Sequence, residues 1–187
     1  MNENHRHCGS EEWRAVVRDS ILPWAIGDLD LGEDVLEVGP GYGATTDIFA
    51  QSVPRLTAVE IDPELASMLR ARFGDNPKVV IVIGDATALE FPDCRFSSAV
   101  SFTMLHHVPT PALQDRLFGE VGRVLRPGGV FVAGDSLASP ELEEHHEGDT
   151  YSPVDPGSLA ERLEAAGFAA VEVKTNPFGW AATGRKP

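Results

Sequence analysis

Basic side chains are scarce in this sequence. Its 187 residues contain 15 lysines and arginines against 29 aspartates and glutamates, which gives a formal net charge of −14. Nucleic-acid phosphates are normally bound by clustered lysines and arginines. The charge balance therefore favours a small-molecule partner and disfavours nucleic acid.

Long apolar runs and cysteines are also scarce. The longest apolar stretches, such as residues 79–83, are far shorter than the ~18 residues of a membrane-spanning helix. The first eight residues contain no apolar run typical of a secretory signal, so we expect a cytoplasmic protein that does not enter a membrane. The two cysteines, Cys8 and Cys94, lie far apart and predict two free thiols. With 42% hydrophobic residues, the composition is that of one globular domain with its own core.

Short apolar runs alternate with amphipathic helical stretches, which is typical of a parallel sheet covered by helices. Strands are expected at residues 35–38, 56–59, 79–83, 99–102, 130–133, 169–173 and about 180–183. Helices are expected to follow Ser10, which can cap a helix that Pro23 ends or kinks, and to begin near residues 44, 63, 111 and 156. The acidic stretch at 141–149 is expected to be a solvated surface loop. The pattern predicts a single doubly wound α/β sheet, with its ligand at the carboxyl ends of the strands.

A glycine-rich turn follows the first expected strand. Gly39, Gly41 and Ala44 match the spacing of a dinucleotide fingerprint, and Glu60 lies about 20 residues further on. Spacing alone leaves a nicotinamide-dependent oxidoreductase as an alternative. Glu37 argues against it, because a carboxylate beside this turn repels a pyrophosphate and attracts an ammonium group. S-adenosylmethionine carries an ammonium and a sulfonium and no phosphate.

From about Leu31 onward the sequence resembles the class I S-adenosylmethionine-dependent methyltransferases, most closely their short branch of the ubiquinone and menaquinone type. Five segments match in order: 37–43, 58–62, 84–86, 101–108 and 123–129. The resemblance implies S-adenosylmethionine as cofactor and S-adenosylhomocysteine as product. It implies the following cofactor-binding residues: Glu37, Gly39, Gly41 and Gly43 around the methionine part, Glu60 on the ribose hydroxyls, Asp85 on the adenine amino group, Ile61 and Ala86 beside the ring, and Ser101 and Phe102 in the fourth-strand motif.

The resemblance also implies an organisation and a reaction. We expect residues 1–30 to form an N-terminal helical lid and residues 31–187 the cofactor-binding domain, with an antiparallel final strand beside the sixth. The expected reaction is methyl transfer to an O, N, C or S nucleophile of a small-molecule acceptor. The fourth-strand motif lacks the Asn/Asp-Pro-Pro-aromatic form, which disfavours methylation of nucleic-acid bases. A catalytically silent cofactor-binding scaffold remains the main alternative, and the oligomeric state stays open.

All six histidines occur as local pairs: His5 with His7, His106 with His107, and His145 with His146. In the expected fold each pair borders the place where the methyl group is transferred, so we predict that the pairs converge on one pocket. His106 and His107 are the candidate catalytic residues, either as a base or to orient the acceptor. The stretches 5–8 and 145–147 offer metal-ligand side chains, but neither spacing matches a closed zinc site, so no metal is predicted.

Overall fold

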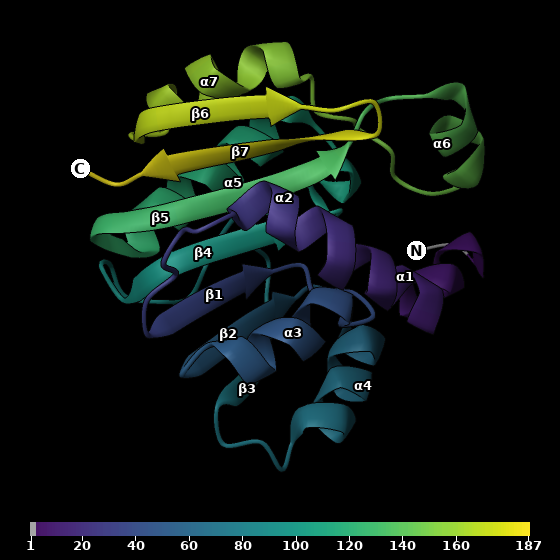
Figure 1. Ribbon diagram of the computed structural model, residues 1–187, viewed down its shortest axis with the longest axis horizontal. Helices are drawn as coiled ribbons and strands as arrows, with labels where there is room; N and C mark the ends of the chain where they lie inside the picture. Colours follow the sequence, from purple (N-terminus) through teal and green to yellow (C-terminus); the bar gives the residue numbers. More distant parts are fainter. Residues whose placement is uncertain (1–2) are drawn as a thin grey trace.

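A single seven-stranded sheet organises the chain in the computed structural model, which describes residues 3–187. The strand order is β3-β2-β1-β4-β5-β7-β6, and only β7 runs antiparallel to its neighbours (Figure 1). The strands are β1 (Asp34–Val38), β2 (Arg55–Glu60), β3 (Val79–Ile83), β4 (Phe96–Phe102), β5 (Leu125–Ser136), β6 (Ala169–Thr175) and β7 (Gly179–Arg185). The predicted doubly wound sheet with an antiparallel final strand beside the sixth is confirmed.

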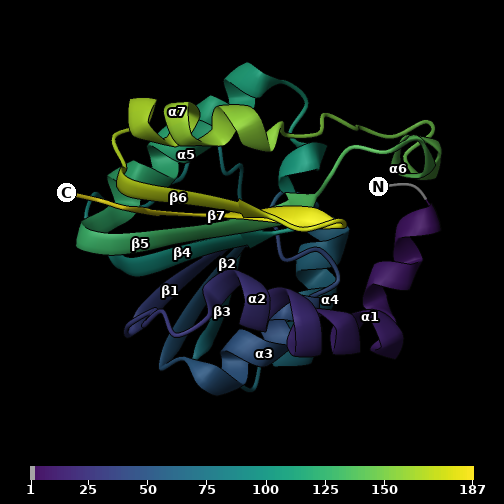
Figure 2. The same cartoon turned by 45° about the horizontal axis from the view of Figure 1, so that its top comes forward.

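Helices cover both faces of the sheet (Figure 2). One face carries α1 (Glu11–Val16), α2 (Leu22–Ile26), α3 (Ala44–Ser52) and α4 (Pro63–Phe73), and the other carries α5 (Pro111–Val124) and α7 (Pro156–Ala165). Successive strand residues point to opposite faces. Accordingly Val130 and Val132 pack with the first layer, whereas Phe131 and Ala133 pack with the second. Burial on both faces explains the nearly continuous apolar strands.

The strand order reverses between β1 and β4, because β2 and β3 extend the sheet in one direction and β4 and β5 in the other. Loops leaving the carboxyl ends of β1 and β4 therefore go to opposite faces and leave a crevice between them. This crevice contains the candidate site described below.

Helix starts follow their predicted capping residues. Asp62 Oδ1 accepts hydrogen bonds from the backbone N–H groups of Glu64 and Leu65 at the start of α4. Asp155 caps α7 in the same way, and Ser10 caps α1. Both α4 and α7 have proline at their first helical position, where its missing N–H costs no hydrogen bond.

The N-terminal segment differs from one regular helix. It consists of η1 (Glu3–Gly9, 3₁₀), α1, a π-helical turn η2 (Val17–Ile21) and α2. Pro23 does not end the helix, which continues to Ile26. Because proline cannot donate a backbone hydrogen bond, the wider turn ahead of it accommodates the break.

The stretch at 141–149, expected as a solvated loop, contains the short helix α6 (Pro140–His145). Ser139 Oγ accepts a hydrogen bond from Leu142 N, and Pro140 occupies the first turn, so a cap signal was present and was overlooked. His146, which follows α6, is only 4% exposed. The expectation of a solvated surface loop is therefore wrong for this residue. In both views, α6 and the N-terminal segment lie side by side at one end of the sheet (Figures 1 and 2).

None of the helices in residues 3–187 has the length and apolarity needed to cross a bilayer. Cys8 and Cys94 are both free thiols, as predicted.

Candidate functional site

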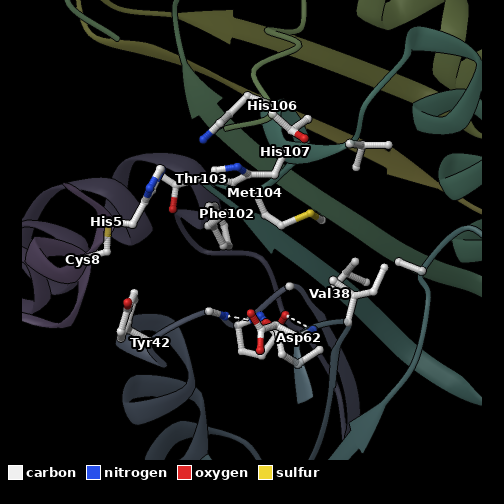
Figure 3. Close-up of a pocket in the computed structure, with 18 of the residues that line it drawn as sticks. His5, Cys8, Val38, Tyr42, Asp62, Phe102, Thr103, Met104, His106 and His107 are labelled. Atoms are coloured by element: carbon white, nitrogen blue, oxygen red, sulfur yellow. Dashed lines mark hydrogen bonds between the residues drawn. The ribbon is translucent and has the colours of Figure 1, made fainter. Parts of the chain in front are cut away.

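A cavity of about 740 Å³ lies at the carboxyl ends of β1, β2, β3 and β4. Its walls come from the loops after these strands, from η1 and from the segment around α6. Figure 3 shows His5 and Cys8 on one wall, His106 and His107 on the loop after β4, and Tyr42 and Asp62 on the opposite side. The cavity is large enough for a nucleoside-sized ligand.

The glycine turn after β1 forms part of the floor. Gly39 and Gly41 line the cavity and have φ angles of +68° and +55°, in the left-handed region that favours glycine. A Cβ on Gly39 would lie 2.1 Å from Cγ of Met104, so a side chain cannot fit there. A Cβ on Gly41 would meet nothing within 4 Å, because it would point into open space. Gly43 precedes α3 and does not line the cavity.

Glu60, the last residue of β2, is 5% exposed and lines the cavity. Its Oε2 accepts a hydrogen bond from Gly41 N at 2.9 Å, and its Oε1 accepts one from Asp62 N at 3.0 Å. Burial raises the pKa of this carboxyl, and the two backbone donors oppose that rise. A carboxylate has about four lone-pair positions, so two remain for hydroxyl donors from a ligand.

The residues after β2 and β3 lie on the same wall. Asp85 is exposed, and its Oδ1 accepts a hydrogen bond from Thr87 N at 2.8 Å, which closes the turn after β3. Ile61 is 67% exposed, a high value for isoleucine, and Ala86 lines the same cavity. This wall therefore offers a carboxylate beside two apolar side chains.

Glu37 lies behind the cavity wall rather than on it. The residue is 2% exposed and accepts a hydrogen bond from the Thr45 hydroxyl, and Thr45 itself lines the cavity. The other carboxylate oxygen, Oε2, is buried without a hydrogen-bond partner. Burial raises the pKa of Glu37 from 4.5 to about 7. This unpartnered oxygen matches a cationic donor.

Of the two residues predicted from the fourth-strand motif, one faces the cavity and the other does not. Phe102 lines the cavity, whereas Ser101 is 1% exposed and does not line it. The alternation of side chains along a strand explains the difference. The next residue, Thr103, has a φ of +51°, which a β-branched side chain rarely adopts. Such strained positions are typical of functional sites.

His106 contacts the carboxylate of Asp135, which lies near the end of β5. Its Nδ1 lies 2.7 Å from Oδ1 of Asp135, and its backbone N–H donates to Oδ2 of the same carboxylate at 3.1 Å. The Asp135 side chain is fully buried, whereas that of His106 is 12% exposed. Asp135 was missed in the sequence, although it lies at the carboxyl end of a strand, as Glu60 does.

All six histidines line the cavity, which confirms the predicted convergence of the three pairs. The ring centroids of His5 and His146 lie 4.7 Å apart, those of His5 and His107 4.9 Å, and those of His107 and His146 5.2 Å. Burial lowers the pKa of His107 to about 3 and that of His5 to about 4. Both imidazoles are therefore neutral at pH 7.

Comparison with known proteins identifies the fold and the family. A model described as a methyltransferase domain matches residues 36–133, just over half of the chain. The PH0226 protein of Pyrococcus horikoshii OT3 superposes with a TM-score of 0.83 at 17% identity, covering 100% of both chains. A Mycolicibacterium smegmatis protein described as a probable S-adenosylmethionine-dependent methyltransferase is 34% identical over 146 residues, which cover 73% of this chain and 52% of that protein.

One comparison corrects an expectation. The ribosomal RNA small subunit methyltransferase A of Synechococcus sp. is 39% identical over 117 residues, which cover 59% of this chain and 41% of the relative. The exclusion of nucleic acid and the expected small-molecule acceptor conflict with this finding. The exclusion rested partly on net charge, which sums the whole surface and does not describe the surface beside one cavity. It also rested on the absence of the Asn/Asp-Pro-Pro-aromatic motif, and the small-molecule acceptor on the resemblance to the ubiquinone and menaquinone branch. The chain spans about half the length of the curated relatives it matches.

The finer assignment to the ubiquinone and menaquinone branch stays a prediction. The family model, the fold and the order of the strand-end motifs all agree with a methyltransferase domain. The chain belongs to the family described as a methyltransferase domain, whose model matches residues 36–133.

Proposed function

We propose that this chain transfers a methyl group from S-adenosylmethionine to an acceptor that enters the histidine-lined part of the cavity. The observation that carries the proposal is the meeting of Gly41, Glu60 and Asp85 from three neighbouring strand ends on one cavity. When bound, the cofactor supplies an activated methyl group on its sulfonium. Three carboxylates, Glu60, Asp62 and Asp85, line this cavity near the glycine turn, and none of its lining residues within 3–187 is a lysine or arginine, an arrangement that disfavours a pyrophosphate ligand.

The residues that would hold the cofactor follow from their positions. Glu60 would accept hydrogen bonds from the ribose hydroxyls with its remaining lone pairs. Asp85 would bind the adenine amino group, and Ile61 and Ala86 would contact the ring. Phe102 would contribute apolar surface to the floor of the cavity.

The methionine part would lie against the glycine turn. Gly39 and Gly41 allow close approach of a ligand to the backbone. Glu37 would attract the ammonium group through the wall that contains Thr45, and its unpartnered oxygen fits that role. Gly43 and Ser101, both outside the cavity lining, would support the site from behind.

His106 is the candidate catalytic residue. Because Asp135 accepts from Nδ1–H, the lone pair of His106 lies on Nε2, where it can take the acceptor's proton as the new bond to the methyl carbon forms. His107 is less suited to that task, because a pKa near 3 makes it a weak base. Asp135 acts through His106 and is a positioning residue.

We also propose that the segments preceding β1 and following β5 act as a lid. His5, Cys8 and Trp13 from the N-terminal segment line the cavity, as do Leu142 and His145 from α6. Residues 31–187 would then form the cofactor-binding domain, with residues 1–30 closing over it. Contact with both segments would exclude water from the reacting groups.

Two measurements test the proposal. Titration calorimetry with S-adenosylmethionine and S-adenosylhomocysteine should detect binding of both ligands. Incubation with methyl-labelled cofactor and a panel of phenols, thiols, amines, carboxylates and ribosomal RNA fragments should then label at least one acceptor class. Heat with NAD but with neither cofactor form would overturn the assignment in favour of an oxidoreductase. Binding without labelling of any acceptor would instead support a cofactor-binding scaffold.

A further inference from the structure

Three imidazoles from distant parts of the chain meet at one side of the cavity. His5 comes from η1, His107 from the 3₁₀ turn η3 (Leu105–His107), and His146 from the segment after α6. One ring nitrogen of each lies within 4.8 Å of one ring nitrogen of each of the others. His5 and His146 are 3% and 4% exposed, and His107 is half-buried. The cluster is therefore a built feature of the interior and not a chance group of surface side chains.

The tautomer of His146 is fixed by the backbone. Its Nδ1 lies 2.6 Å from the carbonyl oxygen of Leu142, which can only accept, so Nδ1 carries the proton. The lone pair of the neutral ring is then on Nε2, which is buried without a hydrogen-bond partner in the part of the chain that the structure describes. A buried acceptor without a donor is costly, and a cation would satisfy it. A histidine that donates its second ring N–H to a carbonyl is also the usual arrangement around a bound metal.

A carboxylate lies beside a second ring of the cluster. Asp149 Oδ2 lies 3.7 Å from Nδ1 of His5, where a carboxylate can orient the ring.

We propose that His5, His107 and His146 bind one divalent transition-metal ion, with zinc as the representative ion. Imidazole nitrogen is a preferred ligand of zinc, copper, nickel and iron. Three protein ligands and one open position are typical of zinc sites that take part in reactions. Here the fourth position would face the cavity, because all three histidines line it.

The spacing is compatible with such an ion. Nitrogens bound to one tetrahedral zinc at about 2.0–2.1 Å lie about 3.4 Å apart, so the three ring nitrogens, now within 4.8 Å of one another, need to approach by no more than about 1.4 Å. Rotation of the imidazoles covers that distance. The prediction of no metal from the sequence considered each histidine pair alone, whereas these ligands come one from each pair.

Metal titration of the untagged chain tests the site. After treatment with a chelator, the wild-type protein should bind one Zn²⁺ per chain in competition with a chromophoric chelator. Co²⁺ should give the intense visible bands of a four-coordinate site. His5→Gln, His107→Gln and His146→Gln should each weaken Zn²⁺ binding at least about tenfold. His7→Gln is the matched control, since His7 is exposed on the same segment as His5, and it should retain the wild-type affinity.

Wild-type affinity in His146→Gln, or no zinc bound against a chelator of micromolar affinity, would overturn the proposal. If the variants fail to fold, as judged by circular dichroism, X-ray absorption of the zinc-loaded wild type decides. A zinc ion with three imidazole ligands supports the site, and one with fewer than three rejects it. Calorimetry with S-adenosylmethionine on the metal-free protein tests the proposed cofactor binding independently of the metal, because none of the three histidines is assigned to the cofactor.

Discussion

Nδ1 of His106 lies 2.7 Å from Oδ1 of the buried Asp135, so one carboxylate at the end of β5 fixes both the ring and the backbone of the candidate catalytic residue. The same Oδ1 accepts a hydrogen bond from Ser136 N at 2.8 Å. With the oxygens so engaged, Asp135 acts as an acceptor only, and the proton of the neutral His106 ring is held on Nδ1.

Asp135→Asn should therefore change the tautomer of His106. The amide has one oxygen for three N–H donors, so its NH₂ group faces Nδ1 or a backbone N–H. Nitrogen NMR of histidine-labelled protein should report a shift of the His106 proton from Nδ1 toward Nε2. Turnover should fall at least about tenfold, within the range of general-base loss, with unchanged affinity for the cofactor.

The exposed Glu144 on α6 provides the control, since Glu144→Gln removes a charge close to the same loops. It should leave both the tautomer and turnover unchanged. An Asp135→Asn protein that turns over at the wild-type rate would show that the pair serves packing alone.

Glu60→Ala should weaken binding of S-adenosylmethionine more than tenfold. Charge-assisted hydrogen bonds contribute about 1.5–3 kcal/mol each, and the alanine also releases the Gly41 and Asp62 N–H groups that Glu60 holds. Glu60→Gln should lie between, because its NH₂ group would face one of these donors. Calorimetry measures both variants, and Glu64→Ala, an exposed carboxylate four residues on, should bind as the wild type does. Equal affinity in Glu60→Ala would contradict the ribose contact.

Glu37 should make the cofactor-free protein less stable as the pH rises from 4.5 to 7. The folded state keeps the proton of Glu37 up to a pKa of about 7, whereas the unfolded chain releases it near 4.5. The native state therefore binds more protons in this window, and the free energy of unfolding falls by as much as about 1.4 kcal/mol per pH unit. Urea unfolding at several pH values measures this slope.

Glu37→Gln serves as the comparison, because glutamine has a similar shape and does not titrate. Its stability should depend less on pH across the same window. Parallel pH profiles for the variant and the wild type would mean that Glu37 titrates normally in the folded state.

Gly39→Ala should abolish cofactor binding and destabilise the fold. The new Cβ would lie 2.1 Å from Met104 Cγ, on the loop that carries the catalytic candidates, and the φ of +68° strains any other residue. Gly128→Ala separates the two effects. Gly128 has a φ of +78°, and its Cβ would meet nothing within 4 Å.

Thermal unfolding and calorimetry of both glycine variants make the comparison. The Gly128→Ala protein should lose about 1 kcal/mol of stability from backbone strain and keep its cofactor affinity. Similar cofactor affinity in the two variants would contradict the importance of the Gly39–Met104 contact.

Much of the fold could be predicted because its signals are local. Asp62 and Pro63 mark the start of α4, and the structure begins the helix at Pro63. The run Val79–Ile83 coincides with β3. The predicted strand bounds were wrong where a strand depends on residues distant in the sequence. Strand β5 begins at Leu125 rather than at Val130, because Gly128 N donates to Lys186 O and Lys186 N donates to Gly129 O.

In the candidate site, too, residues with a local signal could be predicted from the sequence, and residues that depend on distant partners could not. Glu60 and Asp85 are found at strand ends, and a strand end can be recognised in a sequence. Ser101 was expected beside the cofactor but does not line the cavity, because neighbouring residues of β4 face opposite sides of the sheet. Asp135 was missed because its role depends on His106, 29 residues earlier in the chain.

The cavity takes one wall from residue 5 and another from residue 146, and this separation has a consequence during synthesis. At about 5–20 residues per second, a ribosome needs about 7 to 30 seconds to add the intervening 141 residues. Val130 and Val132 of β5, which pack with the apolar face containing Trp13, Val17 and Leu22, are made only near the end of that interval. A nascent chain halted before residue 125 should therefore expose part of that face to a chaperone, and the full chain should bury it.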